Sequence, residues 1–445
     1  MTTLPQVSQA LQTLLTEAAE AADAKLQYTK RPDLAKFSAS TLVQTLVFGW
    51  LAHPDATREQ LAHTAAQVGV CVTPQAIDQR LTRSTAELLR EVLASSTQHL
   101  IAADPVAIPL LQRFTGVRVQ DSTTIILPDQ LAEQWQGCGG SSPEHTAAAL
   151  KCGVQFDVLT GCLCCLDLAD GRAADARLPL QSVALPKGSL RLADLGFVSL
   201  KGLAELSERE VYWLSKLEPT SLISTSAHES QSLLNYVQRY AELASWEEEV
   251  WVGKNRQIQA RLMVTRVPQE VADQRRRRIR KTAQEKGVTP SAVALALASW
   301  TILLTNIPAR LLSIAEALVL SKVRWQIELL FKLWKSHGKV DEWRSQKPEQ
   351  ILCEVYAKLL AMVIQHWVLA VSCWAYPDRS LVKAAQVVRE QTPVLACARA
   401  QVQRLSEALE TIQAILKRNA RINPRRKHPN TYQLLLALTT EPNYA

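Results

Sequence analysis

Motifs of several large enzyme classes are missing from this sequence. It contains no GxGxxG loop, no P-loop and no nucleophile elbow, so an ordinary metabolic enzyme is not indicated. Its first residues, MTTLPQVSQA, lack a basic stretch followed by an apolar one, so we expect no secretory signal and a cytoplasmic location. The sequence also shows no internal repeat and no low-complexity tract.

Metal-binding cysteine patterns and membrane-spanning runs are missing too. Of the nine cysteines only Cys162, Cys164 and Cys165 cluster, without the second CxxC or His pair that zinc requires. We interpret them as small buried thiols of a strand in a reduced compartment. The longest apolar stretches, 292–305 and 358–376, are interrupted by polar residues, and the second favours a buried helix over a membrane span.

What the sequence does contain is a globular composition with clustered positive charge. The 445 residues suffice for about two to four domains. Segment 254–286 carries 11 Lys and Arg against 3 acids, a surplus equal to the net charge of +8 of the whole chain. A second basic run, 417–427, contains no acid. Such clusters indicate binding to a phosphate backbone, although a solvated helix face or a disordered tail gives the same pattern.

Residues 1–105 are rich in Ala, Leu, Gln and Glu at helical spacing, which predicts helices. Segment 57–82 predicts a helix-turn-helix, with a turn at Gly69 and a second helix over 74–81 that Thr73 caps. Such a unit would direct toward DNA the polar residues of its second helix, which are Gln75, Asp78, Gln79 and Arg80. A plain αα-hairpin is the alternative.

From about residue 106 the pattern changes to strands. Segment 151–171 predicts a hairpin that turns at Thr160-Gly161, and segment 189–206 predicts a strand ending at Asp194 before a helix that starts near Ser199. Further strands are predicted within 114–128, 211–219, 247–268 (two strands around Gly253) and 300–308. Helices dominate again from Leu311. This order predicts a mixed sheet that is interrupted by a basic, β-rich insertion.

Segment 321–335, SKVRWQIELLFKLWK, predicts one amphipathic helix. Spacings of three, four and seven residues place Ser321, Arg324, Glu328 and Lys335 along one stripe beside the apolar face. A glutamate flanked by cations at the edge of a buried face suits a site that holds both metal and phosphate. A surface salt bridge between Arg324 and Glu328 is the plainer interpretation of the same spacing.

Two further acids favour the metal-binding interpretation. Asp121 follows the alternation of Val117 and Val119, as an acid at a strand end would, and Asp194 ends the strand segment RLAD. Two strand-end carboxylates beside a helical glutamate can hold two Mg²⁺ ions roughly 3.5–4 Å apart, and oxygen ligands suit Mg²⁺ or Mn²⁺ rather than zinc. Spacing alone does not show that the three acids meet.

These segments resemble, in the same order, the DDE transposases of insertion sequence family four, over about residues 35–375. QDSTTIILP is similar to the family's first-aspartate strand, ADLGFVSLKGL to the second, and VRWQIELLFKLWK to the signature helix with Tyr, Arg, Glu and Lys. The resemblance implies that Asp121, Asp194 and Glu328 are the catalytic, metal-binding acids. It also implies that Arg324 and Lys335 contact DNA phosphates.

The chain departs from the family pattern at two positions. Ser321 stands at the signature tyrosine, where it can donate a hydrogen bond but lacks the ring, and Leu195 follows the second aspartate in place of a frequent basic residue. The resemblance further implies a tryptophan that stacks on a flipped base, for which Trp300 is the candidate, with a core position as the alternative. We expect four other tryptophans to pack internally, namely Trp251, Trp325, Trp334 and Trp343. In the family-like segment DGRAADA, Arg172 and Asp175 are expected to organise the loop.

The resulting expectation is an α/β protein with an RNase H-like core, a mixed sheet flanked by helices. Its expected parts are an N-terminal helical DNA-binding domain (1–105), the core (106–208 and 309–375), the β-rich basic insertion (209–308) and a C-terminal helical region (376–445). Additional DNA contacts are expected from the basic run of the insertion, which comprises Arg275, Arg276, Arg277, Arg278, Arg280 and Lys281.

The expected reaction is cleavage at the ends of an insertion sequence and transfer of the 3′-hydroxyl into target DNA. The resemblance implies two Mg²⁺ ions, for which Mn²⁺ can substitute, a hairpin intermediate, and a homodimer that holds both element ends. Double-stranded DNA would be the partner and the nucleoid the location. Two alternatives stay open at this point: an inactive or domesticated DNA-binding relative, and a DDE-type nuclease that cleaves without joining strands.

Overall fold

The computed structural model describes residues 2–30, 35–139, 146–226, 229–423 and 429–440. They form two compact units. The first unit comprises Met1–Gln112, Asp121–Val183 and Trp325–Leu436, and the second comprises Arg113–Gln120, Ala184–Arg324 and Ala437–Ala445. Strand β1, Val117–Leu127, therefore belongs to the second unit up to Gln120 and to the first unit from Asp121 onward.

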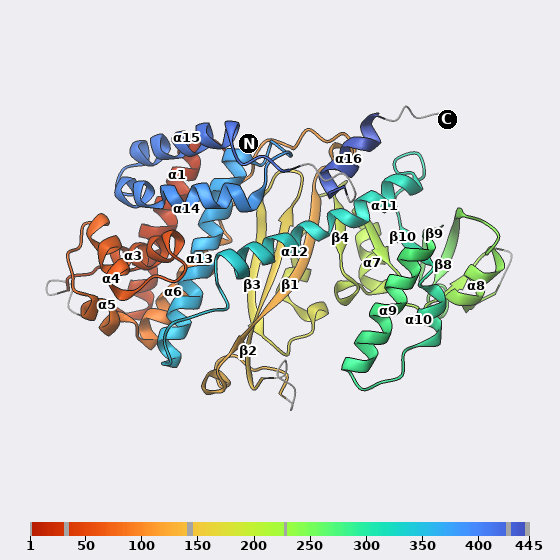
Figure 1. Cartoon of the computed structure of the whole chain (residues 1–445), viewed down its shortest axis with the longest axis horizontal. Coiled ribbons are helices and arrows are strands. Elements are labelled where there is room, and N and C mark those ends of the chain that lie inside the picture. Colours follow the sequence, from red (N-terminus) through yellow and green to blue (C-terminus); the bar gives the residue numbers. More distant parts are fainter. Residues whose placement is uncertain (1, 31–34, 140–145, 227–228, 424–428, 441–445) are drawn as a thin grey trace. The chain divides into compact units, whose positions relative to one another are not determined.

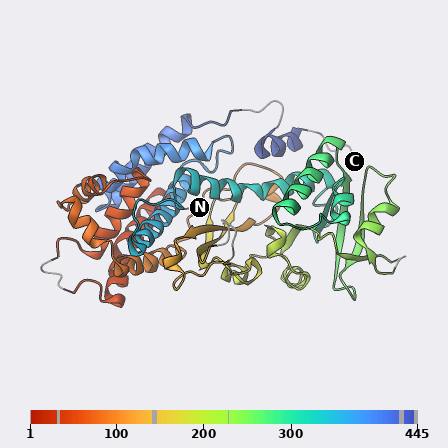
Figure 2. The same cartoon turned by 60° about the horizontal axis from the view of Figure 1, so that its bottom comes forward.

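The first unit contains a helical bundle in which N-terminal helices pack against α14 and α15, near the other end of the sequence (Figures 1 and 2). Its central helix α13, Pro348–Cys373, packs against α3, α6 and α15. The bundle is held together by hydrogen bonds between Ser8 and Ser406 (3.0 Å) and from Gln12 to the Arg399 carbonyl (2.9 Å). The helices of the N-terminal part of the chain are α1 Leu4–Gln12, α2 Ala18–Leu26, α3 Ala39–Ala52, α4 Arg58–Gln67, α5 Pro74–Arg80 and α6 Arg83–Ser96, and those that follow α13 are α14 Leu381–Ala398, α15 Val402–Arg418 and α16 Thr431–Thr440.

Helix α13 is also the one described helix that is long and apolar enough to cross a membrane. Within its most apolar window 94% of the residues are buried against the rest of the structure. Gln365 and His366 are among the buried residues, as the sequence predicts for a core helix.

Helices α4 and α5 are the two helices that the sequence predicts on either side of Gly69, an arrangement shared by a helix-turn-helix and an αα-hairpin. Thr57 caps α4 with a capping box, Thr73 accepts from the Ala76 N–H at the start of α5, and Gly69 adopts the left-handed φ of +84° that the turn needs. One predicted DNA contact is engaged internally: Asp78 accepts from Arg58 (3.1 Å) and from Gln350 of α13 (3.2 Å). Gln75 and Gln79 are exposed.

The predicted hairpin is present, as strands β2 (Ala148–Asp157) and β3 (Leu163–Asp170) with Gly161 at φ +69° in its turn. The turn is docked on α13, because His366 Nε2 lies 2.7 Å from the Gly161 carbonyl, to which the ring N–H donates. Cys165 in β3 and Cys162 directly before it are buried thiols, as the sequence predicts, whereas Cys164 is only half-buried.

The buried imidazole of His366 should make the first unit less stable in acid. Burial lowers the pKa of His366 from the usual 6.5 to about 4, and the hydrogen bond with Gly161 opposes this shift only in part. Between these two values the unfolded chain binds a proton that the folded chain does not, so the free energy of unfolding falls as the pH is lowered from about 6.5 to about 4. The expected slope is about 1.4 kcal/mol per pH unit.

Urea unfolding at several pH values checks this prediction, with His366→Gln as the comparison. The glutamine amide nitrogen reaches about the position of Nε2, so it can still donate to the Gly161 carbonyl, but it does not titrate. The difference in stability between wild type and variant should therefore depend on pH within this window and be constant above it. A constant difference at all pH values would contradict the prediction.

The second unit contains a mixed sheet, as the sequence predicts. Its strand order is β1-β4-β5-β10-β9-β8-β6-β7, with parallel pairing between the first three strands and antiparallel pairing thereafter. The bounds are β4 Leu190–Ala193, β5 Tyr212–Lys216, β6 Leu222–Ser224, β7 Gln231–Ser232, β8 Ser245–Val252, β9 Ile258–Arg266 and β10 Trp300–Thr305. An apolar core that includes Trp213, Tyr236 and Val250 lies under β5, β8 and β9.

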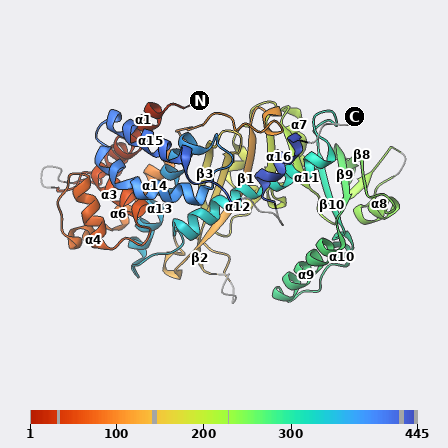
Figure 3. The same cartoon turned by 45° about the horizontal axis from the view of Figure 1, so that its top comes forward.

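The helices of the second unit follow the strands that the sequence predicts. Helix α7, Leu200–Glu208, begins after the Ser199 cap, and α8 spans Leu233–Arg239. Helices α9 (Gln269–Glu285) and α10 (Ala292–Leu297) come between β9 and β10 and extend beyond the end of these strands in Figure 3. Helix α11 spans Ile314–Val323 and follows β10 in the chain.

Two predictions for the segments that carry acids are wrong. Asp121 lies inside β1 instead of at its end, because the β-branched residues that follow continue the strand to Leu127. The single helix predicted over 321–335 is divided: α11 ends at Val323, α12 spans Trp325–Lys332, and a π-helical turn covers Leu333–His337. Since a π-helical turn bonds i to i+5, it rotates Lys335 away from the stripe expected for a regular α-helix.

Candidate active site

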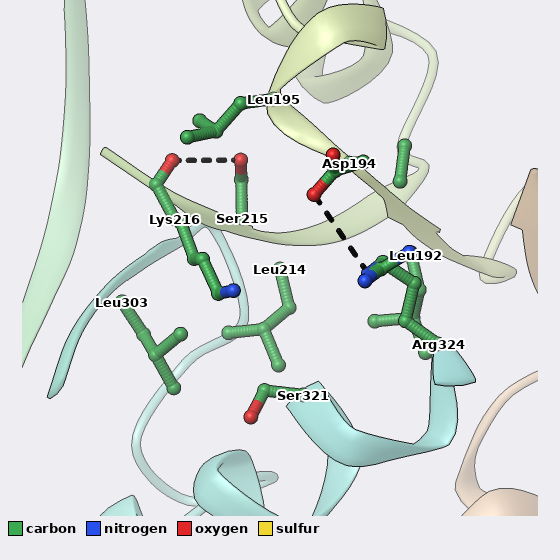
Figure 4. A pocket seen from close by; sticks show the side chains of 10 residues that line it. Leu192, Asp194, Leu195, Leu214, Ser215, Lys216, Leu303, Ser321 and Arg324 are labelled. Carbon is green, nitrogen blue, oxygen red and sulfur yellow. Dashed lines mark hydrogen bonds and ion pairs between the residues drawn. The ribbon is translucent and has the colours of Figure 1, made fainter. Parts of the chain in front are cut away.

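A small pocket in the second unit is lined by Asp194 and by four further polar residues, which are Ser215, Lys216, Ser321 and Arg324. Strand β4 ends at Ala193, so the Asp194 side chain, 50% exposed, projects from the strand end. Arg324, directly after α11, places its Nε 3.9 Å from Asp194 Oδ1 (Figure 4). Ser321 and Lys216 line the same pocket, together with Leu192, Leu214 and Leu303. A carboxylate and two cations around one hollow can receive both a metal and a phosphate.

Lys216 is the pocket residue that the sequence reasoning missed. It ends β5, which pairs in parallel with β4, and its ammonium group points into the pocket in Figure 4. The available signal was a lysine that ends a buried apolar strand, VYWLSK, shortly after the predicted Asp194 strand. Ser321 donates its hydroxyl to the Leu318 carbonyl (2.8 Å), so this hydroxyl is engaged within its own helix.

The first unit carries the other two acids and Lys335. Asp121 is half-buried in β1, and its Oδ1 accepts from the Ser122 N–H at 2.8 Å. Glu328 is half-buried in the first turn of α12. Lys335 Nζ donates to the Thr124 carbonyl of β1 (2.7 Å) and lies 3.9 Å from Asp341 Oδ2, so the π-helical turn rests on the strand that carries Asp121.

The pairing of β1 with β4 relates the two aspartates through the chain itself. The last residues that pair in this parallel ladder are Gln120 and Ala193. The next residue of β1 is Asp121, and the residue directly after β4 is Asp194. The two aspartates are more than 70 residues apart in the sequence, yet each follows the last paired residue of the same ladder. This relation follows from the strand pairing and not from the sequence spacing.

Divalent metal is the cofactor that the donor chemistry of these residues fits. Asp121, Asp194 and Glu328 offer only carboxylate oxygens, which suit a hard divalent cation and not a thiolate-bound metal. Within the described part of the chain, no group of three or more His, Cys, Asp or Glu is arranged as a metal site.

The predicted base-stacking residue and part of the predicted basic surface have partners in the second unit. Trp300 is half-buried, contacts Trp246 edge to face, and has the Arg266 guanidinium 4.6 Å from its ring centroid. Arg275 donates to the Trp300 carbonyl and Arg276 donates to Ser299.

The inward contacts of Arg275 and Arg276 correct the expectation that the whole basic run faces DNA. These two guanidinium groups fasten α9 to β10 and its preceding turn, and burial lowers the pKa of Arg275. The remaining cations of the run are exposed, and they are Arg277, Arg278, Arg280 and Lys281.

The loop and tryptophan expectations have mixed outcomes. Asp175 accepts hydrogen bonds from Ser122 and Lys151, in agreement with a role in organising its loop.

Trp334 is buried, but Trp325 is 51% exposed, which corrects its predicted packing role. Leu329, which is 40% exposed, lies four residues after Trp325 on α12, so this face of the helix is turned to solvent.

The chain is similar to known transposases over most of its length. The family model described as the transposase DDE domain matches residues 112–364, more than half of the chain. The transposase for insertion sequence element IS231B of Bacillus thuringiensis subsp. berliner is 25% identical over 363 residues, which cover 76% of this chain and 74% of that protein. The transposase for element IS1151 of Clostridium perfringens is 26% identical over 322 residues, 67% of this chain and 66% of that protein. The chain therefore belongs to the DDE transposases of bacterial insertion sequences.

Proposed function

We propose that this transposase cleaves DNA at the ends of its insertion sequence and joins the freed 3′-hydroxyls to target DNA, in the manner of family four with its Tyr-Arg-Glu-Lys signature and hairpin intermediate. The observation that carries the proposal is the register of β1 and β4, in which Asp121 and Asp194 each follow the last paired residue. Because neighbouring parallel strands run side by side, carboxylates at matching positions suit a shared pair of cations.

In this proposal Asp121, Asp194 and Glu328 hold two Mg²⁺ ions, for which Mn²⁺ can substitute. Such ions, when bound, would supply positive charge for the scissile phosphate and for the attacking and leaving oxygens. Arg324, whose Nε lies 3.9 Å from Asp194 Oδ1, would contact a phosphate oxygen beside Asp194. Lys335 and Lys216 add point charges for phosphates, and Ser321 supplies one hydrogen bond where the family has tyrosine.

The remaining roles are proposed by region. Residues 1–105 would recognise the terminal inverted repeats, with Gln75, Gln79 and Arg80 of α5 facing DNA. The core would be RNase H-like and would be interrupted by 209–308 as the β-rich insertion, whose Trp300 would stack on a flipped base. Residues 376–445 would support a homodimer that holds two element ends. Of the second basic run, Arg425, Arg426 and Lys427 lie outside the described residues. The protein would associate with the nucleoid through its DNA contacts.

A strand-transfer assay tests the proposed reaction. A labelled duplex that ends in the element's own terminal repeat is incubated with the protein, Mg²⁺ and a supercoiled plasmid, and the products are resolved on a gel. Label that is cut at the repeat end and then joined to the plasmid is the expected result. Cutting without joining would instead favour a DDE-type nuclease. Binding without cutting, even with Mn²⁺, would favour an inactive DNA-binding relative.

The exposed and inward arginines of α9 should differ in their effect on DNA binding. Replacing Arg277 and Arg278 by alanine should lower the slope of log affinity against log salt by about 0.9 for each DNA phosphate that the variant no longer neutralises. Fluorescence anisotropy with a duplex at several salt concentrations measures this slope. The matched control is Arg275→Ala with Arg276→Ala, which removes internal hydrogen bonds and should lower the melting temperature instead. Equal salt slopes for wild type and the Arg277/Arg278 variant would remove α9 from the DNA interface.

A further inference from the structure

Three polar side chains from three different segments meet beside Asp121 in the first unit. Ser122, the next residue of β1, donates its hydroxyl to Asp175 Oδ1 at 2.7 Å. Lys151 of β2 donates its ammonium group to the same oxygen at 3.0 Å. Asp175 itself begins the short 3-10 helix Asp175–Arg177 in the loop after β3. One carboxylate oxygen thus joins two strands to a loop.

The burial of Lys151 indicates that this cluster is a built feature. Lys151 lies within β2, and its side chain is only 12% exposed. The Asp175 side chain is 30% exposed. A buried ammonium group is costly without partners. Lys151 has two hydrogen-bond partners in the loop, which are the Asp175 carboxylate and the Ala173 carbonyl at 2.5 Å. The loop is therefore held onto the strands by charge as well as by hydrogen bonds.

Ser122 connects this cluster with the Asp121 carboxylate. Its backbone N–H donates to Asp121 Oδ1 at 2.8 Å while its hydroxyl donates to Asp175. A single residue thus bonds one carboxylate through its main chain and another through its side chain. Fixing the Ser122 side chain limits rotation of its backbone, and this holds the N–H in the direction of Asp121.

We propose that Asp175, acting through Ser122 and neutralised by Lys151, is a positioning residue for the Asp121 carboxylate. This inference rests on the proposed role of Asp121 as a metal ligand. Hydrogen-bonded partners of metal ligands orient the ligand, and their loss typically weakens metal affinity about 10- to 100-fold. The effect should therefore appear in the metal dependence of the protein and not in its affinity for DNA.

The test compares Ser122→Ala with Ser122→Thr. Mn²⁺ binding to the transposase–DNA complex is measured by isothermal titration calorimetry, and the rate of end cleavage is measured as a function of Mn²⁺ concentration. Ser122→Ala should need about tenfold more Mn²⁺ in both measurements. Ser122→Thr keeps the hydroxyl and should restore wild-type behaviour. Ser182→Ala is the matched control, because the Ser182 hydroxyl donates only to the Pro179 carbonyl of its own turn.

A double variant tests the connection between the two residues. If Asp175 acts through Ser122, Asp175→Ala should add little to the effect of Ser122→Ala on Mn²⁺ affinity. Additive effects of the two substitutions would overturn the inference. An unchanged Mn²⁺ requirement of Ser122→Ala, in a wild-type background that cuts normally, would overturn it as well and leave the proposed function intact. A wild-type chain that neither binds Mn²⁺ nor cuts would overturn the proposed function and this inference with it.

Discussion

Replacing Glu328 by alanine should lower the rate of end cleavage about a thousandfold while the protein still binds its DNA. The magnitude follows from the proposed role as a metal ligand, because metal-borne charge stabilisation contributes several kcal/mol and about 1.4 kcal/mol corresponds to a factor of ten in rate. Glu328 is half-buried in α12, whose apolar residues Ile327, Leu330 and Phe331 form the packed face. Its removal should therefore alter the chemistry more than the packing.

Single-turnover cleavage of a labelled end duplex, with binding measured separately by gel shift, checks this result. Glu407→Ala is a suitable control, because Glu407 is an exposed glutamate of α15 whose carboxylate accepts a hydrogen bond from Gln403, one helical turn earlier. It should change neither binding nor cleavage. Cleavage by Glu328→Ala at the wild-type rate would contradict the assignment of Glu328 as a metal ligand. Loss of DNA binding in this variant would indicate a structural role instead.

The largest effect on stability should come from Lys358→Met. Lys358 and Glu354 form an ion pair of 2.8 Å on α13, and each side chain is only 1% exposed. Lys358 also donates to the carbonyls of Lys339 (3.0 Å) and Glu342 (2.8 Å), so it holds the segment that follows the π-helical turn onto α13. Removing one partner of a buried pair leaves an uncompensated charge, and the expected loss is about 3–5 kcal/mol in the free energy of unfolding.

Urea unfolding, followed by tryptophan fluorescence, measures this loss. Combining Lys358→Met with Glu354→Leu should recover part of it, because no buried charge is then left alone. Recovery should be incomplete, since the two carbonyls still lack their donor. Arg83→Ala provides the matched control: Arg83 and Glu87 have the same four-residue spacing but are 75% and 44% exposed, and their loss should cost less than about 1 kcal/mol. A stable Lys358→Met variant would show that this pair does not act as a buried charge pair in solution.

Positioning of Lys335 links this buried pair to the proposed chemistry. Lys335 lies in the π-helical turn Leu333–His337, and the segment after that turn is the one whose carbonyls Lys358 binds. Lys335 donates to the Thr124 carbonyl of β1, two residues beyond Ser122. Lys358→Met should therefore slow cleavage as well as lower stability, because it releases the segment next to the turn that carries Lys335. This effect would be indirect, since Lys358 itself bonds to two backbone carbonyls and pairs with Glu354.

Local signals determined much of this protein from the sequence alone. The hairpin turn at Gly161, the cap at Ser199 and the cap at Thr73 were predictable, because a positive φ or an N-terminal cap depends on a few neighbouring residues. The family was predictable for a different reason. Asp121, Asp194 and Glu328 stand in segments whose order along the chain is itself a pattern, and that pattern requires no knowledge of contacts.

Tertiary structure alone decided where several of the same residues act. The arginines of α9 are adjacent in the sequence, yet Arg275 and Arg276 turn inward because β10 and its preceding turn offer them oxygen acceptors. Asp121 lies inside its strand because β1, which lies between β2 and β4 in the strand order, continues to Leu127 after its pairing with β4 ends at Gln120. Partners such as these come from segments remote in the chain, and local periodicity carries no information about them.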